Sequence, residues 1–195
     1  MAAHVGNDVV DLGDPEIAAH HGRQRFVERV CTPDEVARVT QSDKAHLMLW
    51  SLFAAKEAGF KVVAKLTPGI AFSPRRFQVD AALTQVCHDD VRLPLLVTQT
   101  DDWVHAVASQ GKIEPVWRVE RRQVEMGESD AVRQLAIQTA ARHLGLPLKA
   151  LAVERDEDRR FRDDLSPPRL LHDGEPVDVD LSLSHDGRWI ACALL

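Results

Sequence analysis

The chain of 195 residues contains 45% apolar and 28% charged residues, a composition that can bury a substantial core and argues against disorder. Its length fits one large domain or two small ones. The formal net charge of −6 argues against a protein that binds nucleic acid through a basic surface. A few placed cations could still form a nucleotide pocket. No apolar run is long enough for a membrane span, and the N-terminus lacks a signal-peptide pattern, so we expect a cytoplasmic protein that does not bind membranes.

The first half of the chain begins with a predicted strand and two predicted helices. An apolar, β-branched run over residues 4–12 indicates a short strand that carries Asp8. Thr32, Pro33 and Glu35 form the pattern of a capping box, so a helix is expected to begin there. A longer helix is predicted from about residue 42 to residue 66, and strands are predicted over 72–83 and 93–109.

The second half repeats this pattern in part. Charge rises and apolar periodicity weakens over 111–129, which predicts a linker or a connection between the two halves. An amphipathic helix is predicted over 129–145, with Ser129 or Asp130 as its cap and Gly145 as its end. Residues 178–195 alternate and then turn at an Asp-Gly pair, which predicts a hairpin. Because both halves end in a hairpin, we expect a duplicated unit of helix plus hairpin, with the ligand site between the halves.

Charged side chains interrupt the long apolar helix. Glu57 and Lys61 share one helical face, and Lys56 lies slightly to the side of it. The simplest interpretation is an exposed ion pair between Glu57 and Lys61, worth a few tenths of a kcal/mol. The alternative is a functional site, because a charged residue on a buried face is costly unless it is paired or bound to something.

Two further polar residues favour a site. Asp8 lies within a strand that should be buried, and together with Glu57 it could supply the hard oxygen ligands that a magnesium ion prefers. His185 lies just before a tight turn and, with Lys56 and Lys61, could bind a phosphate. Each of these residues taken alone is more often structural than functional.

Four segments resemble the 4′-phosphopantetheinyl transferases in motif content: GNDVVDL, FVERVCTPDE, WSLFAAKEAGFK and LSLSHDGRWIACAL. Members of this family transfer the phosphopantetheine arm of coenzyme A to a serine of an acyl or peptidyl carrier protein. The resemblance includes a G-x-D strand and a helix with the pattern F/W-x-x-K-E-x-x-x-K, at a spacing that this chain matches. It implies the α+β fold of that family, with two pseudo-twofold related halves that each combine a helix with an antiparallel sheet.

The order of the motifs suggests how the halves are arranged. Single-domain members, which form trimers, share the order seen here but are shorter, whereas the two-domain, surfactin-type members place the S-x-S-H strand before the G-x-D strand. We therefore interpret the chain as a two-domain member with permuted halves, in which residues 1–115 form the catalytic half and residues 116–195 form the second half. As a pseudo-dimer, such a chain is expected to act as a monomer.

The resemblance also implies the roles of matched residues. Asp8 and Glu57 would hold Mg²⁺ on the pyrophosphate of coenzyme A, and Lys61 would assist the departing 3′,5′-adenosine bisphosphate. Glu57, or a water on the metal, would accept the proton of the carrier serine. Coenzyme A phosphates would be bound by Lys56, Lys61, Ser184, His185 and Arg133.

One position departs from the family pattern. Many two-domain members carry a third acid two residues after the G-x-D aspartate, where this chain has Val10. Water or Asp11 would have to complete the coordination of the metal. Two other functions therefore stay open: a non-catalytic protein of this fold that binds coenzyme A or carrier proteins, and another magnesium-dependent enzyme that processes nucleotides with water as acceptor. The carrier could belong to fatty acid, polyketide or non-ribosomal peptide synthesis.

Overall fold

The computed structural model of this protein describes residues 3–21, 24–111, 114–123, 125–161 and 164–195. The first part of the chain contains β1 (Val5–Asp11), α1 (Pro15–His21), α2 (Gln24–Val30), α3 (Pro33–Gln41), α4 (Ala45–Leu66), β2 (Phe77–Val79), β3 (Gln85–His88), β4 (Val91–Gln99) and β5 (Trp103–Ser109). The second part contains β6 (Val116–Arg121), α5 (Glu128–Leu144), β7 (Leu151–Glu154), β8 (Arg169–His172), β9 (Glu175–Asp186) and β10 (Trp189–Leu194). Short 3-10 turns span Pro74–Arg76 and Leu148–Ala150.

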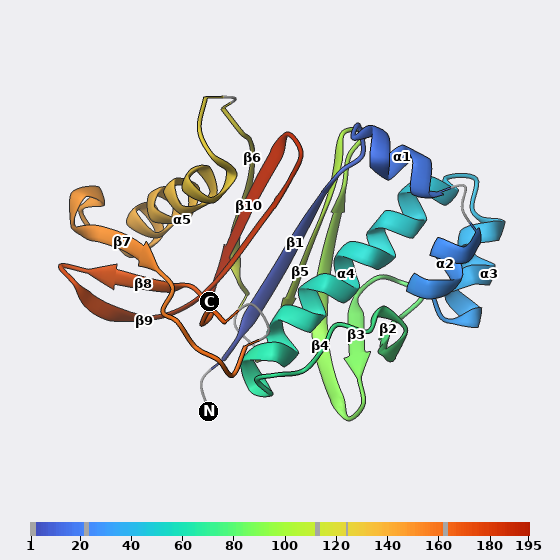
Figure 1. Cartoon of the computed structure of the whole chain (residues 1–195), viewed down its shortest axis with the longest axis horizontal. Helices are drawn as coiled ribbons and strands as arrows, with labels where there is room; N and C mark the ends of the chain where they lie inside the picture. The colour runs from blue at the N-terminus through green and yellow to red at the C-terminus, as the bar shows by residue number, and fades with distance from the viewer. Residues whose placement is uncertain (1–2, 22–23, 112–113, 124, 162–163) are drawn as a thin grey trace.

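Two five-stranded sheets form the framework, and all of their paired strands are antiparallel. The first sheet has the order β1-β5-β4-β3-β2 and the second has the order β6-β10-β9-β8-β7, so the same topology occurs twice. The long helix α4 packs on the first sheet and α5 packs on the second (Figure 1). This arrangement confirms the expected α+β fold with two similar halves.

Each helix buries an apolar face against its own sheet. The interior of α4 includes Leu49, Leu52 and Val62, none of which is exposed to solvent, and these residues belong to the core beneath the first sheet. In α5, Leu135 and Ala136 take the same place above the second sheet. None of the helices in the described part of the chain is long and apolar enough to cross a membrane.

β1 packs unusually closely against α4 at Gly6. A Cβ atom at this position would lie 2.1 Å from the backbone oxygen of Ala58 and 3.0 Å from the Cβ atom of Lys61. Glycine therefore lets the strand approach the helix, which brings residue 8 of the strand near residues 57 and 61 of the helix. Steric crowding between β1 and α4 thus explains why the G-x-D pattern has glycine at this position.

Replacing Gly6 with alanine should therefore destabilise the folded protein by about 3 kcal/mol, at the upper end of the usual range for overpacking, because a backbone oxygen cannot move aside without shifting α4. Urea unfolding would measure the change. Gly127→Ala is the matched control, because its Cβ would have no neighbour closer than 3.7 Å. The control should lose no more than about 1 kcal/mol, the order of a helix-cap effect. Equal losses for the two variants would contradict the steric explanation.

The two sheets meet along a seam between β1 and β9. We use the term seam for four hydrogen bonds in which alternate backbone N–H groups of β1 donate to side chains of β9. The donor and acceptor pairs are Val5 to Asp180 (2.7 Å), Asn7 to Ser182 (2.9 Å), Val9 to Ser184 (3.1 Å) and Asp11 to Asp186 (2.7 Å). The polar residues of β9 that alternate with Leu181 and Leu183 therefore satisfy the free edge of β1.

Local signals for element ends were confirmed in several places. Thr32 and Glu35 form the capping box of α3, and Gly145 ends α5 in the left-handed conformation. Both hairpins, β4–β5 and β9–β10, are present.

The predicted linker over 111–129 was wrong, because β6 lies within it and α5 begins at Glu128. β6 is an edge strand whose residues are mostly half-exposed, so charged side chains are tolerated there. Because of these charges, the sequence lacks the apolar pattern from which a strand is predicted. The cap predicted at Ser129 or Asp130 was also wrong: Gly127 occupies the N-cap position of α5.

Candidate active site

Three of the predicted site residues come together where β1 meets α4. The Nζ atom of Lys61 lies 3.1 Å from Oδ1 of Asp8 and donates a hydrogen bond to the Asn7 carbonyl at 2.7 Å. The pKa of Glu57 is raised to about 7, first by burial and then by the nearby Asp8 carboxylate, while Lys61 partly opposes both effects. The two carboxylates therefore lie close enough to repel each other, and Lys61, which is paired with Asp8, offsets part of this repulsion.

The donor set of this cluster suits a hard divalent cation. Two partly buried carboxylates that repel each other would be stabilised by Mg²⁺, which commonly binds through one or two carboxylates and fills its other positions with water and substrate phosphates. Among the described residues, no group of three or more His, Cys, Asp or Glu side chains could hold a metal ion. The residues present therefore fit a two-carboxylate magnesium site that relies on water and substrate oxygens.

Asp11 does not join this cluster. Arg188 Nη2 lies 2.6 Å from Oδ1 of Asp11, and the backbone N–H groups of Gly13 and Arg188 also donate to the carboxylate. Val10, which occupies the position of the expected third acid, is buried and apolar. The carboxylate of Asp11 is thus engaged by Arg188 and by the backbone of Gly13, away from Glu57 and Lys61.

Lys56 is not placed with the phosphate-binding residues. Its side chain is completely buried, and Nζ lies 2.5 Å from Oε2 of Glu35. It also donates to the backbone oxygens of Val30 and Pro74, at 3.0 and 3.1 Å. The same Glu35 carboxylate accepts the N–H of Val79, so this ion pair joins α3, α4 and β2. Because all three donor positions of the ammonium group are used, Lys56 has no free hydrogen for a phosphate in this conformation.

The second sheet contributes Ser184 to the cluster. Its hydroxyl donates to Oδ1 of Asp8 at 2.9 Å and accepts the N–H of Val9. Of the other predicted phosphate ligands, His185 lies near the end of β9 and Arg133 lies in the second turn of α5. His185 Nδ1 is 3.2 Å from Glu128 Oε2, Arg133 pairs with Asp130, and the side chains of both predicted ligands are 40% exposed.

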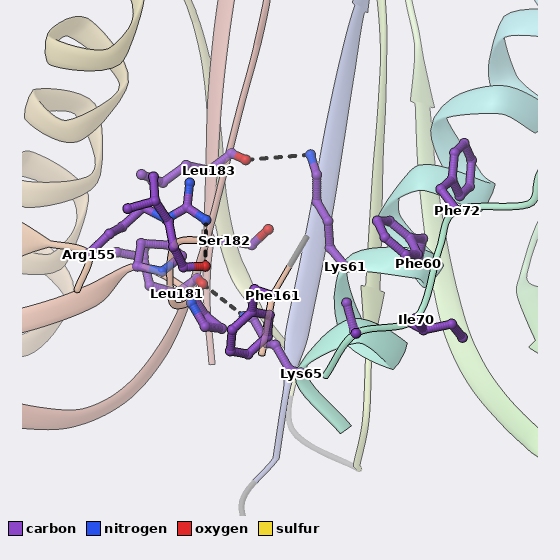
Figure 2. Close-up of a pocket in the computed structure, with 15 residues that line it drawn as sticks. Phe60, Lys61, Lys65, Ile70, Phe72, Arg155, Phe161, Leu181, Ser182 and Leu183 are labelled. Atoms are coloured by element: carbon purple, nitrogen blue, oxygen red, sulfur yellow. Dashed lines mark hydrogen bonds between the residues drawn. The ribbon is translucent and has the colours of Figure 1, made fainter. Parts of the chain in front are cut away.

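A cavity of about 520 Å³ opens beside Lys61, between the end of α4 and the connection from β7 to β8 (Figure 2). Its lining is mostly apolar and aromatic, from Phe60, Ala64, Ile70, Phe72, Phe161, Leu165, Pro167, Pro168, Leu181 and Leu183. Lys65 and Arg155 also line it, and both donate to backbone oxygens, those of Leu181 and Ser166 among them. The cavity therefore combines an apolar interior with cations at its wall.

Sequence reasoning missed much of this cavity. Lys65 belongs to the same helical face as Lys61 but was given no role, and Arg155 and Phe161 lie in a charge-rich connection that has the composition of an ordinary surface loop. The only available signal was helical spacing, which placed Lys65 beside Lys61.

Comparisons with known proteins identify a family for part of the chain. A family model described as the 4′-phosphopantetheinyl transferase superfamily matches residues 4–108, a segment that contains Asp8, Glu57 and Lys61. Among solved structures, the holo-[acyl-carrier-protein] synthase (AcpS) from Neisseria meningitidis is similar over 56% of this chain and 98% of its own, with 27% identity and a TM-score of 0.46. A search of curated proteins found no match. Because the family model covers more than half of the chain, the protein belongs to the 4′-phosphopantetheinyl transferase superfamily.

Proposed function

We propose that this phosphopantetheinyl transferase moves the 4′-phosphopantetheine group of coenzyme A to a serine of an acyl or peptidyl carrier protein, in a magnesium-dependent reaction of the holo-acyl-carrier-protein synthase type that releases 3′,5′-adenosine bisphosphate. Family membership supports the transfer reaction in general. The observation that carries the rest is the convergence of Asp8, Glu57 and Lys61 beside the cavity, within the segment that the family model matches.

Each of the three side chains has a role in the proposed transfer reaction. In this proposal Asp8 and Glu57 hold Mg²⁺, which when bound would neutralise charge on the pyrophosphate of coenzyme A. Lys61 supplies a positive charge beside the phosphoanhydride bond that breaks, where negative charge grows on the departing bisphosphate. Glu57 is also the carboxylate that we assign as acceptor of the proton of the carrier serine. Holding both substrates in line requires no covalent enzyme intermediate.

The remaining parts of coenzyme A can be assigned by their charge. The pantetheine arm carries no charge, so we assign it to the largely apolar cavity beside Lys61. The phosphate on the ribose needs exposed hydrogen-bond donors, and we assign it to His185 near the end of β9 and to Arg133 in α5. Ser184 borders the pyrophosphate position through its contact with Asp8.

We also propose that residues 1–115 and 116–195 are two halves that act together as a monomer. The seam supports this proposal, because the second sheet of the same chain covers the free edge of β1 and brings Ser184 to Asp8. A permuted order of the halves relative to the surfactin-type members remains part of the proposal.

Intact-mass measurement of apo carrier proteins tests the proposed function. The protein would be incubated with coenzyme A, Mg²⁺ and a panel of apo acyl and peptidyl carriers, with EDTA and carrier-free reactions in parallel. We expect one carrier to gain a single phosphopantetheine group, and EDTA to prevent the gain. Coenzyme A binding without any gain in mass would favour the non-catalytic binder. Release of 3′,5′-adenosine bisphosphate without a carrier would favour an enzyme that uses water.

A further inference from the structure

The two serines of the seam, Ser182 and Ser184, differ in one contact. Ser182 and Ser184 both lie on the face of β9 that contacts β1, both are buried, and each accepts one backbone N–H of β1. Only Ser184 also donates to a carboxylate, Oδ1 of Asp8, at 2.9 Å. The two serines are therefore matched in their structural role and differ in their contact with the candidate metal site.

The hydrogen bonds of Ser184 fix the direction of its hydroxyl. Because one lone pair of its oxygen accepts the N–H of Val9, the hydroxyl hydrogen is left to point at Asp8. Oδ1 of Asp8 also accepts a hydrogen bond from Lys61. None of the described residues donates to the other oxygen, Oδ2, so the carboxylate is held with one oxygen occupied and the other open.

We propose that Ser184 is a positioning residue, which holds the Asp8 carboxylate so that Oδ2 is presented to the metal. This inference rests on the proposed function and adds to it that the second half of the chain shapes a metal site whose carboxylates both come from the first half.

Metal binding by the full-length protein tests this role without reference to turnover. The probe is Mn²⁺, a substitute for Mg²⁺, and the free ion is counted by its paramagnetic resonance signal in the absence of coenzyme A. We expect Ser184→Ala to weaken Mn²⁺ binding by about 10-fold or more, the usual size of an effect on a group that orients a metal ligand. Ser182→Ala, which loses an equivalent seam contact, should stay within about 2-fold of the unchanged protein.

A second pair of variants distinguishes the effect of the Ser184 hydroxyl on Mn²⁺ binding from the effect of side-chain packing. Ser184→Thr keeps a hydroxyl and should retain most of the Mn²⁺ affinity. Ser184→Val has nearly the same shape as the threonine variant but no hydroxyl, so it should lose that affinity. Coenzyme A binding measured in EDTA should be the same for Ser184→Ala and the unchanged protein. This pair also keeps the test decisive if Ser184→Ala folds poorly.

Several outcomes would overturn the role of Ser184. Equal Mn²⁺ affinities for Ser184→Ala and Ser182→Ala would reduce Ser184 to a seam contact, and weaker coenzyme A binding by Ser184→Ala in EDTA would make it a phosphate ligand. Failure of the unchanged protein to bind Mn²⁺ would overturn both this role and the proposed magnesium site. If the protein binds Mn²⁺ with the expected differences but modifies no carrier, the positioning role stands and the proposed transfer to carriers fails.

Discussion

Glu57→Gln is expected to lower kcat/KM for carrier modification by about 10²- to 10³-fold, the range found when one group that stabilises a developing charge is removed. Glutamine keeps the shape of the side chain but carries no charge, so it binds Mg²⁺ poorly and cannot accept a proton from the carrier serine. Intact-mass time courses over a series of Mg²⁺ concentrations would measure the loss.

The control for Glu57→Gln is Glu175→Gln, at the exposed start of β9, which removes one negative charge far along the chain from the cluster. It should leave kcat/KM unchanged. Asp8→Asn should cause a comparable loss, and the double variant should lose little more than either single one, because residues that act as a unit are not additive. Additive losses would indicate that the two carboxylates serve separate functions, and a Glu57→Gln enzyme with normal magnesium dependence would contradict the proposed site.

Lys56→Met is expected to lower the free energy of unfolding by about 3 kcal/mol, because it removes the closest and fully buried cationic partner of the buried Glu35 carboxylate. Glu35 keeps hydrogen bonds from the N–H groups of Thr32 and Val79 and an ion pair with Arg38, but Arg38 lies 3.8 Å away and is partly exposed, so it compensates the buried charge only in part. Urea unfolding monitored by tryptophan fluorescence would measure the change, and Trp50, buried in the same core cluster, supplies a signal near the substitution.

Lys61→Met is the matched comparison on the same helix. Its side chain is 29% exposed, so the loss of one ion pair with Asp8 should cost no more than about 1 kcal/mol, while carrier modification should fall sharply. The two substitutions are therefore expected to have different effects: Lys56→Met should lower stability, and Lys61→Met should lower activity. If Lys56→Met folds normally but raises the KM for coenzyme A, then Lys56 contacts the substrate as the family resemblance implied.

Local sequence patterns were sufficient for elements whose ends depend on their own residues. The capping box at Thr32 and Glu35 and the glycine end of α5 satisfy backbone groups within a few residues, so they can be recognised without the fold. β3, β7 and β8 were not predicted, because each has only four residues and depends on pairing with a neighbouring strand. β6 was missed because charged residues are acceptable at a sheet edge.

The sequence by itself determined the family, the duplicated α+β pattern and the set of charged residues on the helix from 45 to 66, because these follow from motif spacing and helical periodicity. Only the tertiary structure decided what each charge does. Lys56 points into the core against Glu35, Lys61 reaches Asp8 at the edge of β1, and Lys65 bonds to Asp180 across the seam. A helix places side chains on its faces by a fixed period, but the elements packed against each face come from distant parts of the chain, so the partners that make one lysine structural and another a candidate for catalysis are set only when the sheets assemble.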